Sequence, residues 1–199
     1  GYDNLPSNDI NLEKLSNKIP SKSVETFLRK TLTLEGFSEV INSPFVENQS
    51  SNCFTVDNPL DSNRNSMRTS LRESLINNLL YNERRQKDSV KFFEISDVYC
   101  VNDKNLVRQK KLGIIASGRI GNNYKEFSQQ INKNYLNDIL VSKLSVSDSI
   151  IENLSRENLD TKIKTPIFYT EIDLKEINGL EADSDLSLIH ISEPTRLAT

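Results

Sequence analysis

Apolar residues recur at helical spacing, three and four positions apart, in three stretches of the chain. These stretches predict helices over residues 21–35, 70–85 and 132–146, and Gly36 follows the first where a helix would end. Their apolar positions are Val24, Phe27, Leu28 and Leu32; then Leu71, Leu75, Ile76, Leu79 and Leu80; then Leu136, Ile139, Leu140 and Leu144.

The start of the second predicted helix has the sequence pattern of a capping box. Residues 70–73 read SLRE, so we expect the Ser70 hydroxyl to accept a bond from a backbone N–H and Glu73 to reach back. Arg84 and Arg85 follow at the other end, where cations suit the negative pole of the helix dipole. Ser21 similarly predicts the N-cap of the first helix.

Segments rich in β-branched and aromatic residues predict strands over residues 90–100, 111–120 and 165–174. A further strand over 37–46 is broken by Pro44, and a short one lies near 53–56. Residues 112–116 are apolar at every position, which is typical of a central strand. Strands and helices of irregular lengths favour an α+β fold with a largely antiparallel sheet.

The pattern divides the 199 residues into three parts. Residues 1–20 are polar with two prolines and predict a linker from an upstream domain. Residues 21–185 form the predicted core. Residues 186–199, LSLIHISEPTRLAT, resemble the translation of a sequencing-library transposase adapter, and the alternative is an ordinary amphipathic end. The sequence does not begin with Met, so we expect a fragment.

The amino-acid composition argues against several classes of protein. The net charge of −3 argues against a dedicated nucleic-acid binder, although a local basic patch is compatible with it. Cys53 and Cys100 are far apart and predict reduced thiols of a cytoplasmic protein. The chain holds no run of about 18 apolar residues and no basic, apolar leader, so neither a membrane span nor a signal peptide is expected.

The residue types needed for several chemistries are missing. The one histidine, His190, lies in the adapter-like tail, so neither a serine nor a cysteine triad can be assembled. Two separated cysteines are too few for zinc. GRIG at Gly118–Gly121 predicts a turn and not a phosphate loop. Glu94 and Asp97 point to opposite strand faces. We therefore expect no catalytic residue and no metal ligand in this chain.

Arg68 is the sharpest candidate for a site. It stands between Met67 and Thr69 directly before a predicted helix. An arginine among apolar residues needs a carboxylate or phosphate partner. Arg68 could clamp a phosphate, or it could pair with Glu94 or Glu73 and join the sheet to the helix.

A basic cluster follows the second predicted helix. Arg84, Arg85 and Lys87 could contact a nucleic-acid backbone. The same pattern is typical of a solvated helix end, and both interpretations stay open.

Several motifs in order resemble the beta subunit family of bacterial phenylalanyl-tRNA synthetases, over roughly residues 1–180. They are GYDNLP, NPL, SMRTSL, LLYNERR, VKFFEISDVY and LGIIASG. The resemblance implies an (αβ)₂ ligase that attaches phenylalanine to its tRNA, with the alpha subunit using ATP and Mg²⁺. It also implies that this chain is a class II synthetase-like core, an antiparallel sheet flanked by helices, without a working active site.

The resemblance places Arg68 where a catalytic class II synthetase binds the ATP α-phosphate. A later Gly-rich strand ending in arginine is also needed, and nothing between Ile131 and Leu180 supplies it. We therefore expect Arg68 to be a vestigial phosphate position and no ATP or Mg²⁺ to bind this chain. The magnesium-binding, editing and anticodon-binding parts of the family lie outside it.

The resemblance thus predicts a cytoplasmic, non-catalytic scaffold that packs against the alpha subunit and meets tRNA(Phe) through the holoenzyme. Residues 21–45 and 70–85 are the expected partner contacts, because their apolar stripes are wide. The alternatives are an active ATP-dependent ligase with Arg68 on ATP, or a tRNA-contacting module led by Arg84, Arg85 and Lys87.

Overall fold

A computed structural model describes residues 24–47, 53–102, 105–121, 126–146, 150–157, 159 and 162–180. The predicted linker 1–20, the Ser21 cap and the adapter-like tail 186–199 with His190 lie outside the described residues. The boundaries of the predicted core at 21 and 185 therefore stay predictions.

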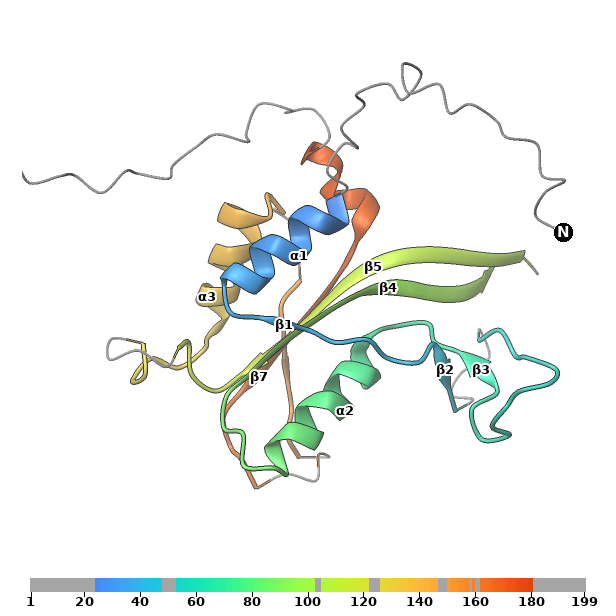
Figure 1. The fold of residues 1–199 in the computed structure, drawn as a ribbon, viewed down its shortest axis with the longest axis horizontal. Coiled ribbons are helices and arrows are strands. Elements are labelled where there is room, and N and C mark those ends of the chain that lie inside the picture. The colour runs from blue at the N-terminus through green and yellow to red at the C-terminus, as the bar shows by residue number, and fades with distance from the viewer. Residues whose placement is uncertain are drawn as a thin grey trace, which may run out of the picture.

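A five-stranded sheet forms the centre of the molecule, with strand order β1-β4-β5-β7-β6 (Figure 1). β1 runs parallel to β4, and the other neighbours are antiparallel. A second sheet pairs β2 with β3. The strands are β1 Ser38–Glu39, β2 Phe45–Val46, β3 Ser66–Met67, β4 Val90–Asn102, β5 Asn105–Ser117, β6 Glu152–Leu154 and β7 Ile167–Asp173.

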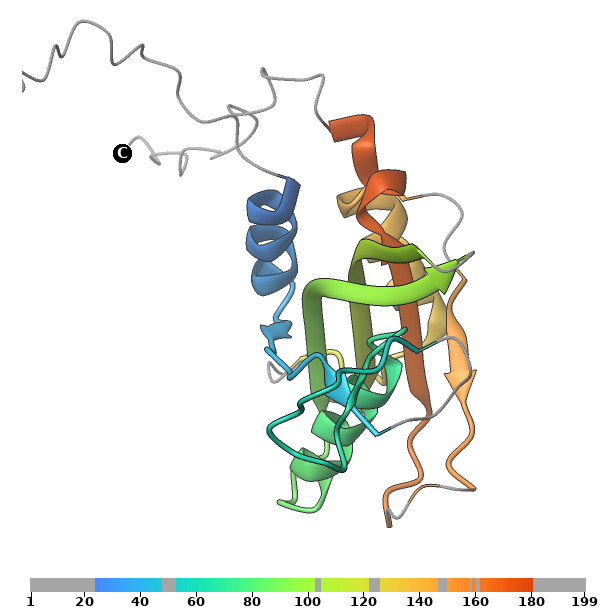
Figure 2. The same cartoon turned by 90° about the vertical axis from the view of Figure 1, so that its right-hand side faces the viewer.

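The sheet carries helices on both faces (Figures 1 and 2). α2 packs on one face, and the remaining helices pack on the other. The bounds are α1 Val24–Leu34, α2 Arg72–Glu83 and α3 Lys133–Asp138, which continues as the π-helical η3 Ile139–Lys143; η4 Leu174–Leu180 is a 3₁₀ helix. The architecture is the predicted α+β arrangement with a mostly antiparallel sheet.

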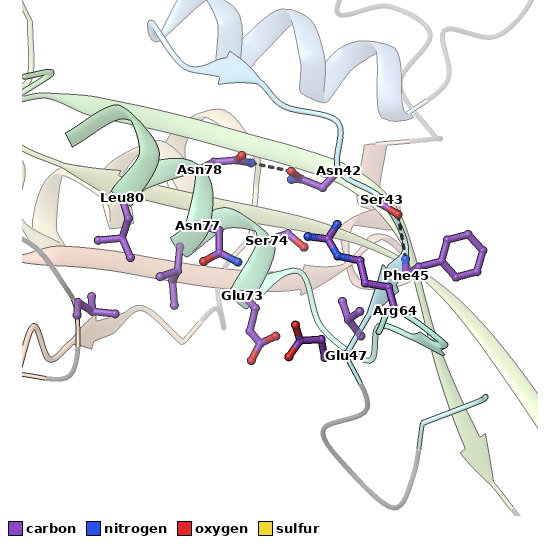
Figure 3. Close-up of a pocket in the computed structure, with 13 residues that line it drawn as sticks. Asn42, Ser43, Phe45, Glu47, Arg64, Glu73, Ser74, Asn77, Asn78 and Leu80 are labelled. Atoms are coloured by element: carbon purple, nitrogen blue, oxygen red, sulfur yellow. Dashed lines mark hydrogen bonds between the residues drawn. The ribbon is translucent and has the colours of Figure 1, made fainter. Parts of the chain in front are cut away.

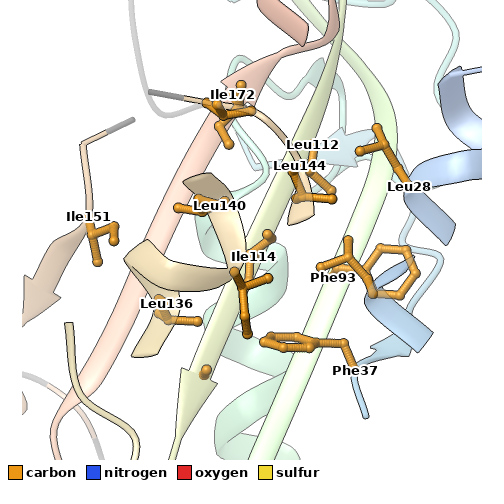
Figure 4. Close-up of a cluster of buried hydrophobic side chains, with 14 of the residues drawn as sticks. Leu28, Phe37, Phe93, Leu112, Ile114, Leu136, Leu140, Leu144, Ile151 and Ile172 are labelled. Atoms are coloured by element: carbon orange, nitrogen blue, oxygen red, sulfur yellow. The ribbon is translucent and has the colours of Figure 1, made fainter. Parts of the chain in front are cut away.

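Two hydrophobic cores result, one on each face of the sheet. The first joins α1, α3 and η3 to the sheet, with Leu28, Phe93 and Ile114 fully or almost fully buried (Figure 4). The second places the α2 leucines against Ile115 and neighbouring strand residues. A strand buried on both faces reads as continuously apolar. This explains why residues 112–116 identified β5 as central.

The observed elements follow most of the sequence pattern. Gly36 ends the first helix with φ of +80°, and Pro44 separates β1 from β2. Residues 53–56 supply only an isolated bridge, between Thr55 and Ser66. β3, β6 and η4 were not predicted, since such short segments carry little periodicity.

The predicted role of the 70–85 stripe in partner contacts is wrong. Leu71, Leu75 and Leu79 are completely buried against the chain's own sheet. The wide apolar face of this helix is used for folding, so it is not available to a second subunit.

Lys91 on β4 joins three segments on the first face. Its Nζ donates to the backbone carbonyl oxygens of Glu35 (2.9 Å) and Ile120 (2.8 Å) and lies 3.4 Å from the Tyr135 hydroxyl. Burial lowers the pKa of Lys91. Burial, together with the nearby Glu35 and Glu126 carboxylates, raises the pKa of Tyr135 to about 12.

Tyr135 should make the fold sensitive to alkaline pH. Its pKa is raised from about 10 in the unfolded chain to about 12, so its contribution is present below about pH 10 and is lost as pH rises toward about 12. Urea unfolding against pH, compared with Tyr135→Phe, measures this slope. The variant should lose stability less steeply than the wild type in that window, and parallel curves would contradict the assignment. Lys91 is present in both proteins. Its lowered pKa makes stability rise with pH, and this contribution cancels when the two curves are compared.

Candidate functional site beneath helix α2

A row of polar positions crosses the sheet beneath the start of α2. The strand register places Glu94 of β4 beside Gly113 of β5, and Gly113 beside Glu171 of β7. Residues in register on adjacent strands share a face. Two carboxylates therefore flank one glycine on the face that α2 covers.

Arg68 meets the first of these carboxylates. Its Nη2 lies 2.7 Å from Glu94 Oε1, and each side chain is only 2 % exposed. Its Nε donates to the Asp97 carbonyl oxygen at 3.3 Å. The predicted pairing of Arg68 with Glu94 is thus confirmed, whereas Glu73, the other proposed partner, is exposed on α2.

The backbone N–H and carbonyl of Arg68 are both hydrogen-bonded. Its N–H donates to the Pro44 carbonyl oxygen, and its own carbonyl accepts from the Tyr99 N–H, both at 2.9 Å. Arg68 therefore ties the segment after β1, the entry to α2 and the strand β4 together at one point.

Two asparagines extend this ion pair toward the surface. Asn42 Nδ2 donates to Glu94 Oε2 at 2.7 Å, and Asn78 Nδ2 of α2 donates to Asn42 Oδ1 at 2.9 Å. Both asparagines line a groove of about 570 Å³ between α2 and residues 42–47 (Figure 3). Glu47, Glu73 and Arg64 stand at this groove, whereas Arg68 does not line it.

The second carboxylate, Glu171, caps α2 from across the sheet. Its Oε2 accepts from the Ser70 hydroxyl at 2.7 Å and from the Leu71 N–H at 3.0 Å. Lys111 Nζ donates to its Oε1 at 2.8 Å, and the Tyr169 hydroxyl also donates to this carboxylate. Four donors thus converge on one side chain.

The predicted capping box at Ser70–Glu73 is confirmed for Ser70 and wrong for Glu73. The Ser70 oxygen accepts from the Arg72 N–H at 3.1 Å, as expected, whereas the Glu73 side chain is exposed. Glu171 supplies the carboxylate that Glu73 was expected to provide. An anion suits this end of a helix because the dipole is positive there.

The environment of Glu171 favours its charged form. Burial acts to raise the pKa of this carboxyl, but the bonds from Lys111, Tyr169, Ser70 and the Leu71 N–H outweigh it, so the pKa lies below the usual value of 4.5. Burial and the adjacent Glu171 charge raise the pKa of Tyr169. Tyr169 therefore stays a hydrogen-bond donor, and Glu171 stays an anion.

Leucines fill the space between the two carboxylates. A Cβ built on Gly113 would lie 2.8 Å from Leu75 Cδ1 and 3.1 Å from Leu71 Cβ. Helix α2 thus rests directly on the sheet at the row Glu94–Gly113–Glu171. The arrangement supports packing and hydrogen bonding, and it holds no room for a ligand at that point.

The basic residues of the sequence analysis lie at the other end of α2. Arg84, Arg85 and Lys87 are exposed after the last turn, and the Arg85 guanidinium lies 3.4 Å from the centre of the Tyr81 ring. The structure does not bring them to Arg68. Within the described ranges, no group of three or more His, Cys, Asp or Glu side chains could hold a metal ion. Nor does any described helix have the length and apolarity to cross a membrane.

Sequence reasoning missed Lys111, Glu171 and a second buried ion pair. Arg156 donates to both carboxylate oxygens of Glu83, at 3.0 and 2.8 Å. Glu171 did leave a signal, because it occupies an inward position of the strand, two residues after Tyr169. A charge at such a position needs a partner, although the pattern cannot name it.

Removing Arg68 should strongly destabilise the fold. Arg68→Met leaves the Glu94 carboxylate buried without its cation, which costs about 3–5 kcal/mol. The double variant with Glu94→Leu should recover most of that loss, because no charge remains. Urea unfolding measures both. Arg72→Met is the control: its ion pair with Glu152 is half exposed, so a change below about 1 kcal/mol is expected. A single variant as stable as the control would contradict the interpretation.

Replacing Glu171 should produce a pH-dependent loss. Glu171→Gln weakens the cap and the Lys111 pair, for a loss of about 1–3 kcal/mol at neutral pH. Since the folded pKa is lowered, the wild-type advantage is full above about pH 4.5 and disappears as pH falls through that lower value. Unfolding free energies of both proteins between neutral and acidic pH test this, with the exposed Glu152→Gln as control. A constant difference across that range would refute it.

Comparison with known proteins now assigns the fold. The chain resembles two structures of pyrrolysyl-tRNA synthetase from Desulfitobacterium hafniense, with TM-scores of 0.56 and 0.55 and 16 % identity in each case. The matches cover 83 % of this chain and 71 % or 72 % of those chains. At this identity they show the fold alone, which is that of a class II tRNA synthetase.

Sequence comparison assigns the family. The chain is 31 % identical over 117 residues to the phenylalanine–tRNA ligase beta subunit of Dehalococcoides mccartyi. The match covers 53 % of this chain and 14 % of that relative, so the chain spans a small part of its length. A family model described as the phenylalanyl tRNA synthetase beta chain CLM domain matches residues 11–148, more than half of the chain. The chain therefore belongs to the phenylalanyl-tRNA synthetase beta chain family.

Proposed function

We propose that this chain is a non-catalytic scaffold within a phenylalanine–tRNA ligase, where it packs against the alpha subunit. The family and the ligase named in its relative support the setting. One observation carries the scaffold role: Leu71 and Leu75 lie directly over Gly113, so a helix occupies the sheet face between Glu94 and Glu171.

The residues present do not fit a nucleotide. Arg68 is the phosphate-type position implied by the family resemblance, but it is 2 % exposed and its guanidinium is paired with Glu94. A phosphate would have to displace that carboxylate at a position that is shielded from solvent. In this proposal ATP and Mg²⁺ serve the holoenzyme through the alpha subunit, and the setting is the cytoplasm.

The partner surface in this proposal is α1 with the segment that follows it. Four apolar side chains of residues 24–47 are exposed at 36 %, 77 %, 92 % and 39 %: Phe27, Leu34, Ile41 and Phe45. β1 lies at the edge of the sheet in the same segment. Exposed apolar side chains gathered on one segment are typical of a subunit interface. The proposal therefore keeps residues 21–45 as the partner contact and no longer includes the apolar stripe of residues 70–85.

Charges placed on this surface should weaken the complex without unfolding the chain. Leu34→Glu and Ile41→Glu alter side chains that are already mostly exposed, and each should weaken binding of a purified alpha subunit about tenfold or more. Isothermal titration calorimetry measures the affinity. Ile150→Glu, at a side chain 78 % exposed outside this segment, is the matched control. Equal affinity for all three variants and the wild type would contradict the proposed surface.

An activity assay on the same purified chain distinguishes the scaffold proposal from the alternative of an active ligase. The chain alone should give no phenylalanine-dependent ATP–pyrophosphate exchange. Exchange that is lost on Arg68→Met, in a preparation that still folds, would favour the active ligase instead.

A further inference from the structure

Two arginine–aromatic pairs stand at the end of the sheet where α2 terminates. The Arg85 guanidinium lies 3.4 Å from the centre of the Tyr81 ring, and the Arg119 guanidinium lies 4.1 Å from the centre of the Phe127 ring. Tyr81 is 55 % exposed and Phe127 is 56 % exposed. Large aromatic side chains are normally the groups that a fold buries most readily, so two exposed ones held by cations indicate a surface made for contact.

The fold links Arg119 to the segment that follows α2 and Arg85. Asp88, three residues after Arg85, forms an ion pair with Arg119. Ser89 Oγ donates to the Arg119 carbonyl oxygen at 2.8 Å and accepts from its N–H at 3.1 Å. Gly118, with φ of +99°, permits this approach, because a Cβ there would collide with the Asp88 carbonyl oxygen.

The same surface is locally basic on an acidic chain. Arg84, Arg85 and Lys87 are exposed beside Asp88, whereas the whole chain has a net charge of −3. Asp88 is already paired with Arg119. We call the set Tyr81, Arg84, Arg85, Lys87, Arg119 and Phe127 the stacking surface.

We propose that the stacking surface binds unpaired nucleotides of tRNA. Bases stack on aromatic rings and on guanidinium planes whatever their sequence, and a basic groove or ridge holds the phosphates. An arginine already stacked on a ring has its plane fixed, so its N–H groups can bond phosphate at little further cost in entropy. An acidic peptide would use the charges but has no need of the two rings.

This inference rests on the proposed function for the identity of the RNA. It goes beyond the basic cluster Arg84, Arg85 and Lys87 read from the sequence, since the structure adds Tyr81 of the preceding turn and a second pair more than thirty residues away. A solvated helix end would only expose charges to water. An RNA-binding surface also needs bases to stack on its rings, and this requirement distinguishes the two interpretations.

Fluorescence anisotropy of the 199-residue chain with a labelled, unstructured single-stranded RNA of about 12 nucleotides tests the proposal. Tyr81→Ala and Phe127→Ala should each weaken binding roughly 5- to 100-fold and leave the salt dependence unchanged. The double variant Arg85→Ala/Lys87→Ala should instead lower the slope of log K against log salt by about 1.4, because each phosphate contact of a single strand contributes about 0.7.

Matched controls separate stacking from general charge. Phe54→Ala removes an exposed phenylalanine elsewhere, and Lys30→Ala/Lys175→Ala removes two exposed cations outside the surface. Neither should change affinity by more than about twofold, and unlabelled tRNA(Phe) should compete with the probe.

Three outcomes would overturn the inference. They are no binding at low salt, binding that is indifferent to both aromatic substitutions, and displacement of the RNA by polyglutamate as effectively as by tRNA. Alpha-subunit binding is measured on the same variants. If it is intact while RNA binding fails, the inference is wrong and the scaffold proposal stands; if the wild type binds RNA but no alpha subunit, the scaffold proposal is the one that fails.

Discussion

The buried ion pair between Arg68 and Glu94 is the constraint around which the rest of the molecule is arranged. Two charges whose side chains are each only 2 % exposed are tolerated as a pair, because their attraction offsets part of the cost of removing them from water. The pair therefore fixes where the chain may enter α2 relative to β4. The backbone bonds from Arg68 to Pro44 and Tyr99 hold the same point from two further directions.

Everything on this face follows from the position at which α2 begins. Its leucine stripe packs on Gly113, where a Cβ would lie so close to Leu71 and Leu75 that these side chains would have to shift. Glu171 then accepts from the Leu71 N–H at the start of the helix and supplies the anionic cap. A face of the sheet that could have formed an open pocket is instead closed by a helix, which suits a support better than an enzyme.

The two ends of α2 have different characters. At its start, charges are buried, paired and rigid, and they contribute to the fold. At its end, the exposed Arg85 is stacked on the exposed ring of Tyr81, which is part of the surface that we propose binds RNA. The resemblance to pyrrolysyl-tRNA synthetase structures concerns the fold alone.

Periodicity in the sequence determined the helices over 24–34 and 72–83, the long strands and the central place of β5, because burial on one or both faces leaves a direct trace in residue order. It also showed that Arg68 needs an anion, since a cation among apolar residues cannot stay unpaired. Only the tertiary structure decided which anion. Glu94 and Glu73 were equivalent in sequence, and the strand register selected Glu94. The acidic half of the helix cap was misjudged for the same reason: the Leu71 N–H donates to Glu171, 100 residues away, and the local Glu73 is exposed. Contacts between distant residues depend on how strands align and helices dock, and short-range patterns carry no information about either.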